Sequence, residues 1–222
     1  MKKIINKIFL LAAFLSFGCA EDYLDTLPTD AVSEGLVFTT TQNARTALNG
    51  IHRAMFIRWD SQGQPGEGGV MIVRDVMGED LVMTTQGNGW FVAYSRWLRH
   101  NDETQGDVRF VWRFYYAIIG NANMIIANID NAEGPQSDKD EIKGQALAYR
   151  AWAHWNLVQL FAQRFDAGGA NTQLGVPLVL QPITEGGPRN TVAEVYAQVN
   201  TDIDAAIALL KTSRAAKSHI NV

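Results

Sequence analysis

The 222-residue sequence predicts a mainly α-helical fold in which antiparallel helices stack as they do in a repeat protein. Three observations lead to this prediction: four segments carry apolar residues at helical spacing, a short polar link joins two of them, and 47% of the chain is hydrophobic. That hydrophobic fraction is sufficient for a substantial core, so a disordered tail and a fibrous protein are excluded. The length fits one domain or a piece of a larger one.

The first two predicted helices cover about residues 41–58 and 107–128. In both segments, apolar residues recur three or four positions apart and therefore lie on one face of a helix. Thr41 occupies a position from which its hydroxyl can cap the first helix. The apolar positions are Ala44, Ala47, Leu48, Ile51 and Met55 in the first segment, and Val111, Tyr115, Ile118, Ile119, Ala122, Ile125, Ile126 and Ile129 in the second.

The third predicted helix covers residues 137–161 and begins with Ser-Asp-Lys-Asp, a capping-box pattern. It carries two apolar faces, so it is expected to pack between neighbours on both sides. One face carries Ile142, Ala146, Tyr149, Ala153, Leu157 and Leu160, and the other carries Ala148, Trp152, Trp155 and Val158. A second capping pattern, from Thr191 to Glu194, begins the fourth helix, which extends to about Leu210.

The connections between these helices differ strongly in length. Residues 131–136 form a short polar link, so the second and third helices are predicted to form an antiparallel hairpin. The third helix then needs a further hairpin on its other face, which is the arrangement of a stacked helical repeat. Residues 59–106 and 163–190 are long connections, which we interpret as binding surfaces that contain short helical or strand pieces.

The first 18 residues have the features of a secretory signal peptide. Lys2, Lys3 and Lys7 precede an apolar run over residues 8–17. As a helix, that run rises only about 15 Å, which is too short to span a membrane. Cys19 follows a glycine and is predicted to be the lipidated first residue of the mature chain. The alternative is an ordinary signal peptide followed by a chance cysteine.

The predicted organisation has three parts: a lipoprotein signal peptide at 1–18, a lipidated extended segment at 19–40, and a helical-repeat domain at 41–222. After the fourth helix, a polar stretch leads into residues 218–222, which resemble the opening of another element. A stack of repeats needs a polar terminal cap, and the sequence shows none there. We therefore expect the repeat domain to be the N-terminal part of a longer one.

Charge and residue usage exclude several function classes. The formal net charge is −4, so the basic surface typical of nucleic-acid binding is not expected. The single cysteine excludes a disulfide framework, and the four histidines lie far apart without metal-ligand spacing, so no metal site is expected. The sequence contains no phosphate-binding loop or dinucleotide fingerprint, so no cofactor is expected. The glycine-rich stretch at 63–69 is interpreted as a flexible loop.

The best candidate for ligand contact is the loop that contains Gln86, Asn88 and Trp90. Sugars have an apolar C–H face that stacks on aromatic rings, and their hydroxyls need amides and carboxylates in fixed directions. Trp97 follows closely enough to contribute a second aromatic surface. The competing interpretation is that these tryptophans belong to the core, since tryptophan is highly buried on average.

Three carboxylates precede this loop. Asp75 and Glu79 are four residues apart and would share one face of a helix, and paired carboxylates can supply the acid and base of glycoside hydrolysis. Solvated or salt-bridged acids are the commoner case. For Asp80 we therefore favour positioning of the loop, or acceptance of hydrogen bonds from a ligand, and we assign no catalytic residue.

Two polar residues interrupt the apolar third helix. His154 is interpreted as a hydrogen-bonded core histidine. Arg150 is interpreted as a structural charge that needs a buried acceptor, because an unpaired buried charge is costly.

Five motifs, in order along the chain, resemble the SusD/RagB family. They are the stretch from Cys19 to Asp30, the run Ala47-Leu-Asn-Gly-Ile51, the helix 112–128 with Tyr115, Ile118 and Asn121, the stretch from Gly144 to Phe161 followed by Gly175-Val-Pro-Leu178, and the run Arg189-Asn-Thr-Val-Ala-Glu-Val-Tyr196. The motifs differ from the family after Phe161, where a glycine is common in the family and Ala162 occurs here.

The resemblance implies a surface-exposed outer-membrane lipoprotein built from tetratricopeptide-like helical hairpins. Members of the family pair with a SusC-like TonB-dependent transporter and deliver to it an oligosaccharide, or in some cases a peptide, while the lipid anchor holds them on the membrane. This implies nutrient binding without catalysis. Two alternatives remain: a helical-repeat scaffold that binds only protein partners, and a secreted glycoside hydrolase.

Overall fold

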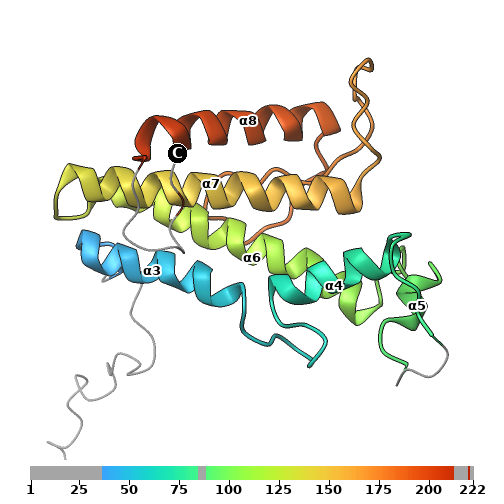
Figure 1. Cartoon of the computed structure of the whole chain (residues 1–222). Coiled ribbons are helices and arrows are strands. Elements are labelled where there is room, and N and C mark those ends of the chain that lie inside the picture. Colours follow the sequence, from blue (N-terminus) through green and yellow to red (C-terminus); the bar gives the residue numbers. More distant parts are fainter. Residues whose placement is uncertain (1–36, 85–88, 213–219, 221–222) are drawn as a thin grey trace, which may run out of the picture. The chain divides into compact units, whose positions relative to one another are not determined.

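The computed structural model describes residues 37–84, 89–212 and 220 (Figure 1). The chain divides into two units, Met1–Val37 and Phe38–Val222, and nearly all of the described residues belong to the second. The predicted signal peptide, Cys19 and the ligand candidates Gln86 and Asn88 lie outside the described residues.

The described part of the chain is helical, which confirms the predicted fold class. Its elements are α3 (Thr41–Ala54), α4 (Glu67–Met77), α5 (Val92–Ser95), α6 (Gly106–Asn128), the 3₁₀ turn η2 (Ile129–Asn131), α7 (Gln136–Phe161) and α8 (Val192–Leu209). Within the described residues, β-structure is limited to three isolated bridges: Thr40 with Glu133, Arg58 with Pro65, and Leu174 with Thr191. None of the described helices is long and apolar enough to cross a membrane.

The four long helices form a stack in which α7 lies between α6 and α8 (Figure 1). Helix α3 packs against both α6 and α7. The central position of α7 confirms the expectation drawn from its two apolar faces. The core between the helices is built from buried aromatic and branched aliphatic side chains, of which the largest are Phe110, Phe114, Tyr115, Leu48, Ile51, Ile118, Ile119, Ile125, Ile129, Ile142 and Leu157.

The N-terminal cap predicted from the sequence is confirmed at α8, whereas the caps predicted for α3 and α7 differ from those in the structure. The capping box of α8 is present: Thr191 Oγ1 accepts a hydrogen bond from Glu194 N, and a carboxylate oxygen of Glu194 accepts one from Thr191 N. The cap of α3 is Thr40, one residue before the predicted position. Thr41 instead donates its backbone N–H to the Glu133 carbonyl.

The predicted capping box at Ser137 is wrong. Helix α7 begins at Gln136, after Pro135, and no side chain caps it. The carbonyl of Pro135 already accepts hydrogen bonds from the backbone N–H groups of Asp138 and Lys139. Ser137 therefore falls inside the first turn, where a hydroxyl can no longer cap the helix.

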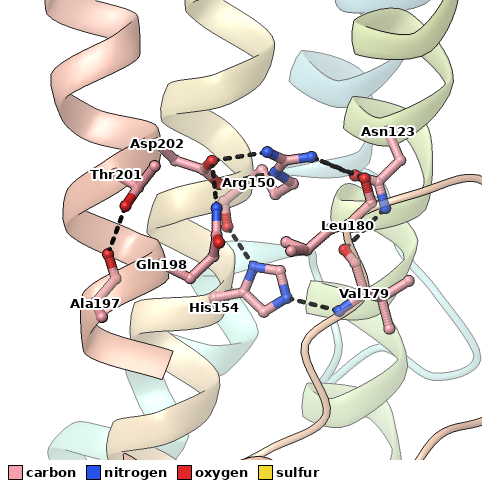
Figure 2. A network of polar contacts seen from close by, with 9 residues as sticks. All are labelled: Asn123, Arg150, His154, Val179, Leu180, Ala197, Gln198, Thr201 and Asp202. Atoms are coloured by element: carbon pink, nitrogen blue, oxygen red, sulfur yellow. Dashed lines mark hydrogen bonds and ion pairs between the residues drawn. The ribbon is translucent and has the colours of Figure 1, made fainter. Parts of the chain in front are cut away.

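A buried ion pair joins α7 to α8 (Figure 2). Arg150 donates from Nε and Nη2 to the two carboxylate oxygens of Asp202, both at 2.7 Å, and the two side chains are only 8% and 3% exposed. Its Nη1 donates to Asn123 Oδ1 on α6 at 2.9 Å and to the Leu180 carbonyl at 3.1 Å. Arg150, on α7, is therefore hydrogen-bonded to α6, to α8 and to the connection before α8. These contacts confirm that it is a structural charge with buried acceptors.

One turn further along α7, His154 is fully buried and hydrogen-bonded, as predicted. Its Nε2 accepts from the backbone N–H of Val179 at 3.4 Å, so Nδ1 carries the proton and donates to the Arg150 carbonyl at 3.1 Å. Burial lowers the pKa of His154 to about 4, since the apolar surroundings disfavour the charged ring. The histidine is therefore neutral in the folded protein near neutral pH.

The middle of the long connection between α7 and α8, residues 176–181, is hydrogen-bonded to helix α6. Tyr116 Oη donates to the Pro177 carbonyl at 2.8 Å, and Asn123 Nδ2 donates to the carbonyls of Val179 and Gln181 at 2.9 and 3.2 Å. Val176 is fully buried in the core. The middle of this connection is therefore part of the packed structure.

Replacement Asp202→Asn is expected to lower the free energy of unfolding by about 3–5 kcal/mol, because it leaves the Arg150 cation buried without its counter-charge. The matched control is Asp60→Asn, which removes the carboxylate of the exposed pair Arg113–Asp60 at 2.9 Å and is expected to cost less than about 1 kcal/mol. Urea denaturation followed by circular dichroism measures both. Equal effects of the two variants would contradict a stabilising role for the buried network.

The stability of the protein is also expected to depend on pH through His154. Its pKa is lower in the folded state than the unfolded value of 6.5, so the unfolded chain binds the proton first as the pH falls. The contribution is complete above pH 6.5 and is lost between pH 6.5 and about 4, with a total of about 3 kcal/mol. In urea denaturation from pH 7 to 4, His154→Gln should show a smaller fall in stability than the wild type. Parallel pH profiles for the two proteins would disprove the assignment.

Candidate ligand-binding site

An open pocket of about 210 Å³ lies at the N-terminal end of α6. Three segments form it: the connection between α3 and α4, the residues just before α5, and the first turn of α6. Helices α4 and α5 lie at the same end of the stack as the start of α6 (Figure 1). The residues that line the pocket are Ser61, Gln62, Gly63, Trp90, Phe91 and Asp107.

The connection between α3 and α4 is a tight loop that is closed by backbone hydrogen bonds. Trp59 N donates to the Gln64 carbonyl at 3.0 Å, and Glu67 N donates to the Met55 carbonyl at 2.8 Å. Gly66 makes the second closure possible: its φ is +54°, and a Cβ atom there would overlap the Met55 carbonyl. Only glycine fits such a conformation without strain.

The expectation of a flexible glycine-rich loop at 63–69 is only partly correct, because Glu67 begins helix α4. Two contacts to the main stack fix this helix. Tyr115 Oη donates to Glu67 Oε2 at 3.0 Å, and Arg74 Nη1 donates to Asn156 Oδ1 at 2.9 Å. Burial raises the pKa of Glu67, although the Tyr115 hydrogen bond opposes the rise. These tertiary contacts stabilise a helix that its glycines disfavour.

A second, small core lies beneath the pocket. Val73, Val76 and Tyr94 are buried together, and Phe91 and Val108 pack against them. Burial, reinforced by a hydrogen bond to the Asp107 carboxylate, raises the pKa of Tyr94 to about 12. The phenol therefore remains protonated and donates to Asp107.

Asp107 is the polar centre of the pocket. Its Oδ1 also accepts from Gln64 Nε2 at 3.1 Å, and Gln64 is almost completely buried. Two donors from different segments therefore fix the orientation of the carboxylate. A carboxylate can accept about four hydrogen bonds, so capacity remains for the hydroxyl groups of a ligand.

Trp90 supplies the apolar surface of the pocket. Its side chain is 44% exposed, and its ring lies edge-on to Phe91, with 6.2 Å between the centroids. The backbone of this segment is strained: Phe91 and Trp97 have φ values of +59° and +57°, which bulky residues rarely adopt. Such strain is often found at functional sites, where the surrounding structure imposes it.

The structure separates the other predicted site residues. Trp97 is 56% exposed but does not line the Trp90 pocket; its ring contacts His100, with 5.0 Å between the centroids. Asp80 is exposed beyond the end of α4 and does not line the pocket either. Asp75 and Glu79 are exposed as well. Gln86 and Asn88, outside the described residues, remain predictions.

Sequence reasoning missed Asp107 and Gln64. An acidic residue in the first turn of a helix has an ordinary explanation in the helix dipole, so Asp107 carries no local signal of a site. Its partner Gln64 is 43 residues away in the sequence. The sequence therefore offers no way to pair them.

Comparison with known proteins shows where this architecture occurs. The helical stack and the aromatic pocket define a helical-repeat protein with a polar, aromatic-lined surface site. Residues 61–221 match the family model of the SusD-like proteins, described as "Starch-binding associating with outer membrane". The match covers most of the chain, so the chain belongs to the SusD-like family. No curated protein matches the chain.

Solved structures show the same fold. A SusD-like carbohydrate-binding protein from Bacteroides vulgatus ATCC 8482 is 30% identical, with a TM-score of 0.74 over 83% of this chain and 39% of that one. A SusD superfamily protein from Bacteroides thetaiotaomicron VPI-5482 is 25% identical, with a TM-score of 0.63 over 82% and 39%. A laminarin-binding SusD-like protein is 17% identical, with a TM-score of 0.57 over 82% and 36%. The chain spans about two fifths of the length of these structures.

Replacement Gly66→Ala is expected to lower the free energy of unfolding by at least about 2 kcal/mol, because a Cβ atom would collide with the Met55 carbonyl at a positive φ. The matched control is Gly120→Ala within α6, where a Cβ atom meets nothing within 4 Å. The control should stabilise the protein by about 0.5–1 kcal/mol, since alanine is the better helix former. Thermal and urea denaturation measure both. A neutral Gly66→Ala would contradict the role of this glycine.

Proposed function

We propose that this protein captures an oligosaccharide at the Trp90 pocket, as part of a surface lipoprotein that delivers it to a SusC-like TonB-dependent transporter. The observation that carries the proposal is the combination of an exposed Trp90 with a carboxylate, Asp107, held in place by Tyr94 and Gln64. Membership of a family described as starch-binding and the likeness to a carbohydrate-binding protein support it.

The geometry suits binding by stacking and directed hydrogen bonds. The C–H face of a sugar ring packs on Trp90, and its hydroxyls donate to Asp107. The pocket of about 210 Å³ is smaller than the roughly 300–1,000 Å³ of sites that enclose a drug-sized ligand. It therefore takes one sugar residue of a longer chain, and the remaining residues lie on the surface around it.

The protein holds the glycan without converting it. Hydrolysis of a glycosidic bond needs two carboxyl groups on opposite sides of the bond. Among the described residues that line the pocket, Asp107 is the one carboxylate. The carboxylates Asp75, Glu79 and Asp80 are exposed on and beyond α4 and do not line it.

The lipoprotein part of the proposal rests on the sequence and the family. The apolar run after Lys2 and Lys3 and the single cysteine at position 19 have the pattern of a lipoprotein signal. The family is described as associating with the outer membrane. Acyl chains on Cys19 would hold the protein at the membrane and raise its local concentration at a transporter.

One observation favours a scaffold that binds only protein partners. An apolar groove of about 460 Å³ lies along α7 and α8, and the partly exposed side chains of Trp155, Ile203 and Ile207 line it. Such a groove suits a protein partner rather than a sugar, because it offers few polar groups. The following experiment separates the two functions.

Replacement Trp90→Ala is expected to weaken glycan binding at least tenfold, since it removes the stacking surface. The probes are maltohexaose and laminarihexaose, and isothermal titration calorimetry measures their affinity. The matched control, Trp155→Ala, removes a similarly exposed tryptophan from the groove along α7 and α8 and should leave glycan affinity unchanged. Sensitivity to Trp155→Ala combined with insensitivity to Trp90→Ala would refute the proposed site. Absence of binding to these two neutral glycans and to an acidic one such as trigalacturonate would favour the scaffold.

A further inference from the structure

A second pocket, of about 380 Å³, lies on the other side of the first turn of α6. Val108 and Arg109 line it, whereas the preceding Asp107 lines the Trp90 pocket. Residues two apart on a helix point to nearly opposite sides, so this single turn separates the two pockets. The end of α7, at Phe161, and Arg189 before α8 complete the second pocket.

Arg189 is held in a fixed position at its edge. Its Nη1 donates to the carbonyls of Phe161 and Gly175 at 2.9 and 2.7 Å, and its guanidinium lies 5.5 Å from the centre of the Trp112 ring. The guanidinium has five N–H donors in a planar fork, and these bonds use only those of Nη1. Nε and Nη2 remain for a ligand. Because the group is already ordered, binding costs less conformational entropy.

Arg109 adds a second cation to the pocket. It is exposed, and it makes no ion pair with a carboxylate among the described residues. Glu103 is the one acidic residue in the described lining, so two guanidinium groups face a single carboxylate. The pocket is therefore locally positive, although the chain as a whole has a net charge of −4.

His100 completes the polar lining and connects the pocket to Trp97. Its Nδ1 is buried and has no hydrogen-bond partner, and its ring contacts the exposed ring of Trp97. Trp97 thus lies beside this pocket, where its face can stack on a sugar. The second pocket therefore combines an aromatic surface with two arginines, whose positive charges exceed the negative charge of Glu103 by one.

We infer that this second pocket binds an acidic sugar residue, with the carboxylate of a uronic acid between Arg109 and Arg189. A carboxylate is planar and accepts two parallel N–H bonds from a guanidinium, which is the geometry that the free edge of Arg189 offers. Since a turn of α6 separates this pocket from the Trp90 pocket, one acidic oligosaccharide can occupy both. The inference rests on the proposed function and narrows its ligand to a glycan that contains uronic acid.

The test compares trigalacturonate with its fully methyl-esterified form, which has the same sugars without the charges. Isothermal titration calorimetry should show at least tenfold tighter binding of the acid. Arg109→Gln should abolish most of that difference, and the matched variant Glu103→Gln should preserve or increase it. Raising the salt concentration should weaken binding of the acid to the wild type more than to Arg109→Gln, because salt screens exposed charges. Arg109 is chosen over Arg189, whose bonds to two carbonyls also support the fold.

Each other outcome overturns the inference in a distinguishable way. Equal affinity for the acid and the ester, or insensitivity to Arg109→Gln, refutes the acidic-sugar site, whereas Trp90-dependent binding of maltohexaose would still support the proposed function. If N-acetyl-trialanine, a peptide carboxylate, binds as tightly as trigalacturonate, the pocket recognises the carboxylate without the sugar. If none of these glycans binds, both the inference and the proposed function fail.

Discussion

The structure depends on a buried arginine. Arg150 lies in the middle of the central helix α7, and its guanidinium needs acceptors on every side because an unpaired charge in the interior is very costly. Asp202 on α8, Asn123 on α6 and the carbonyl of Leu180 supply them (Figure 2). All three must be in place together, so α8 and the connection before it are coupled to the hairpin of α6 and α7.

The candidate ligand-binding surface, in contrast, lies over a second, small core with few members. Tyr94, Val73 and Val76 pack under the Trp90 pocket and not in the main core. Hydrogen bonds join this region to the helical stack: Tyr115 donates to Glu67, Arg74 donates to Asn156, and Tyr94 and Gln64 donate to Asp107 on α6. A satellite core of this kind can hold strained backbone such as that at Phe91, because the rigid helices beside it provide the support.

The first turn of α6 organises the candidate ligand surface. On one side, Asp107 lines the aromatic Trp90 pocket and is its hydrogen-bond acceptor, held in place by Gln64. On the other side, Arg109 lines the positively charged pocket, in which Arg189 is a donor held in place by backbone carbonyls. If both pockets bind the proposed glycan, the carboxylate of the first suits the hydroxyl groups of the ligand and the arginines of the second suit its acidic groups. Specificity of this kind arises from unpaired charges and hydrogen-bonding groups that a wrong ligand would leave unsatisfied.

The sequence by itself determined the four long helices, α3, α6, α7 and α8, since their signals are local. Apolar residues three and four apart define a helical face, and the capping box of Thr191 and Glu194 is complete within one turn. It also predicted that Arg150 needs a buried acceptor. It could not show that the acceptor is Asp202, 52 residues later, or that Gln64 orients Asp107. It expected short helical or strand pieces within residues 59–106 but did not place α4, whose glycines disfavour a helix, and it missed the two pockets beside α6. Tertiary structure alone decided these pairings, the position of α4 and the two pockets. Each depends on side chains from segments that helix packing brings together, and their spacing in the chain does not reveal that they are close.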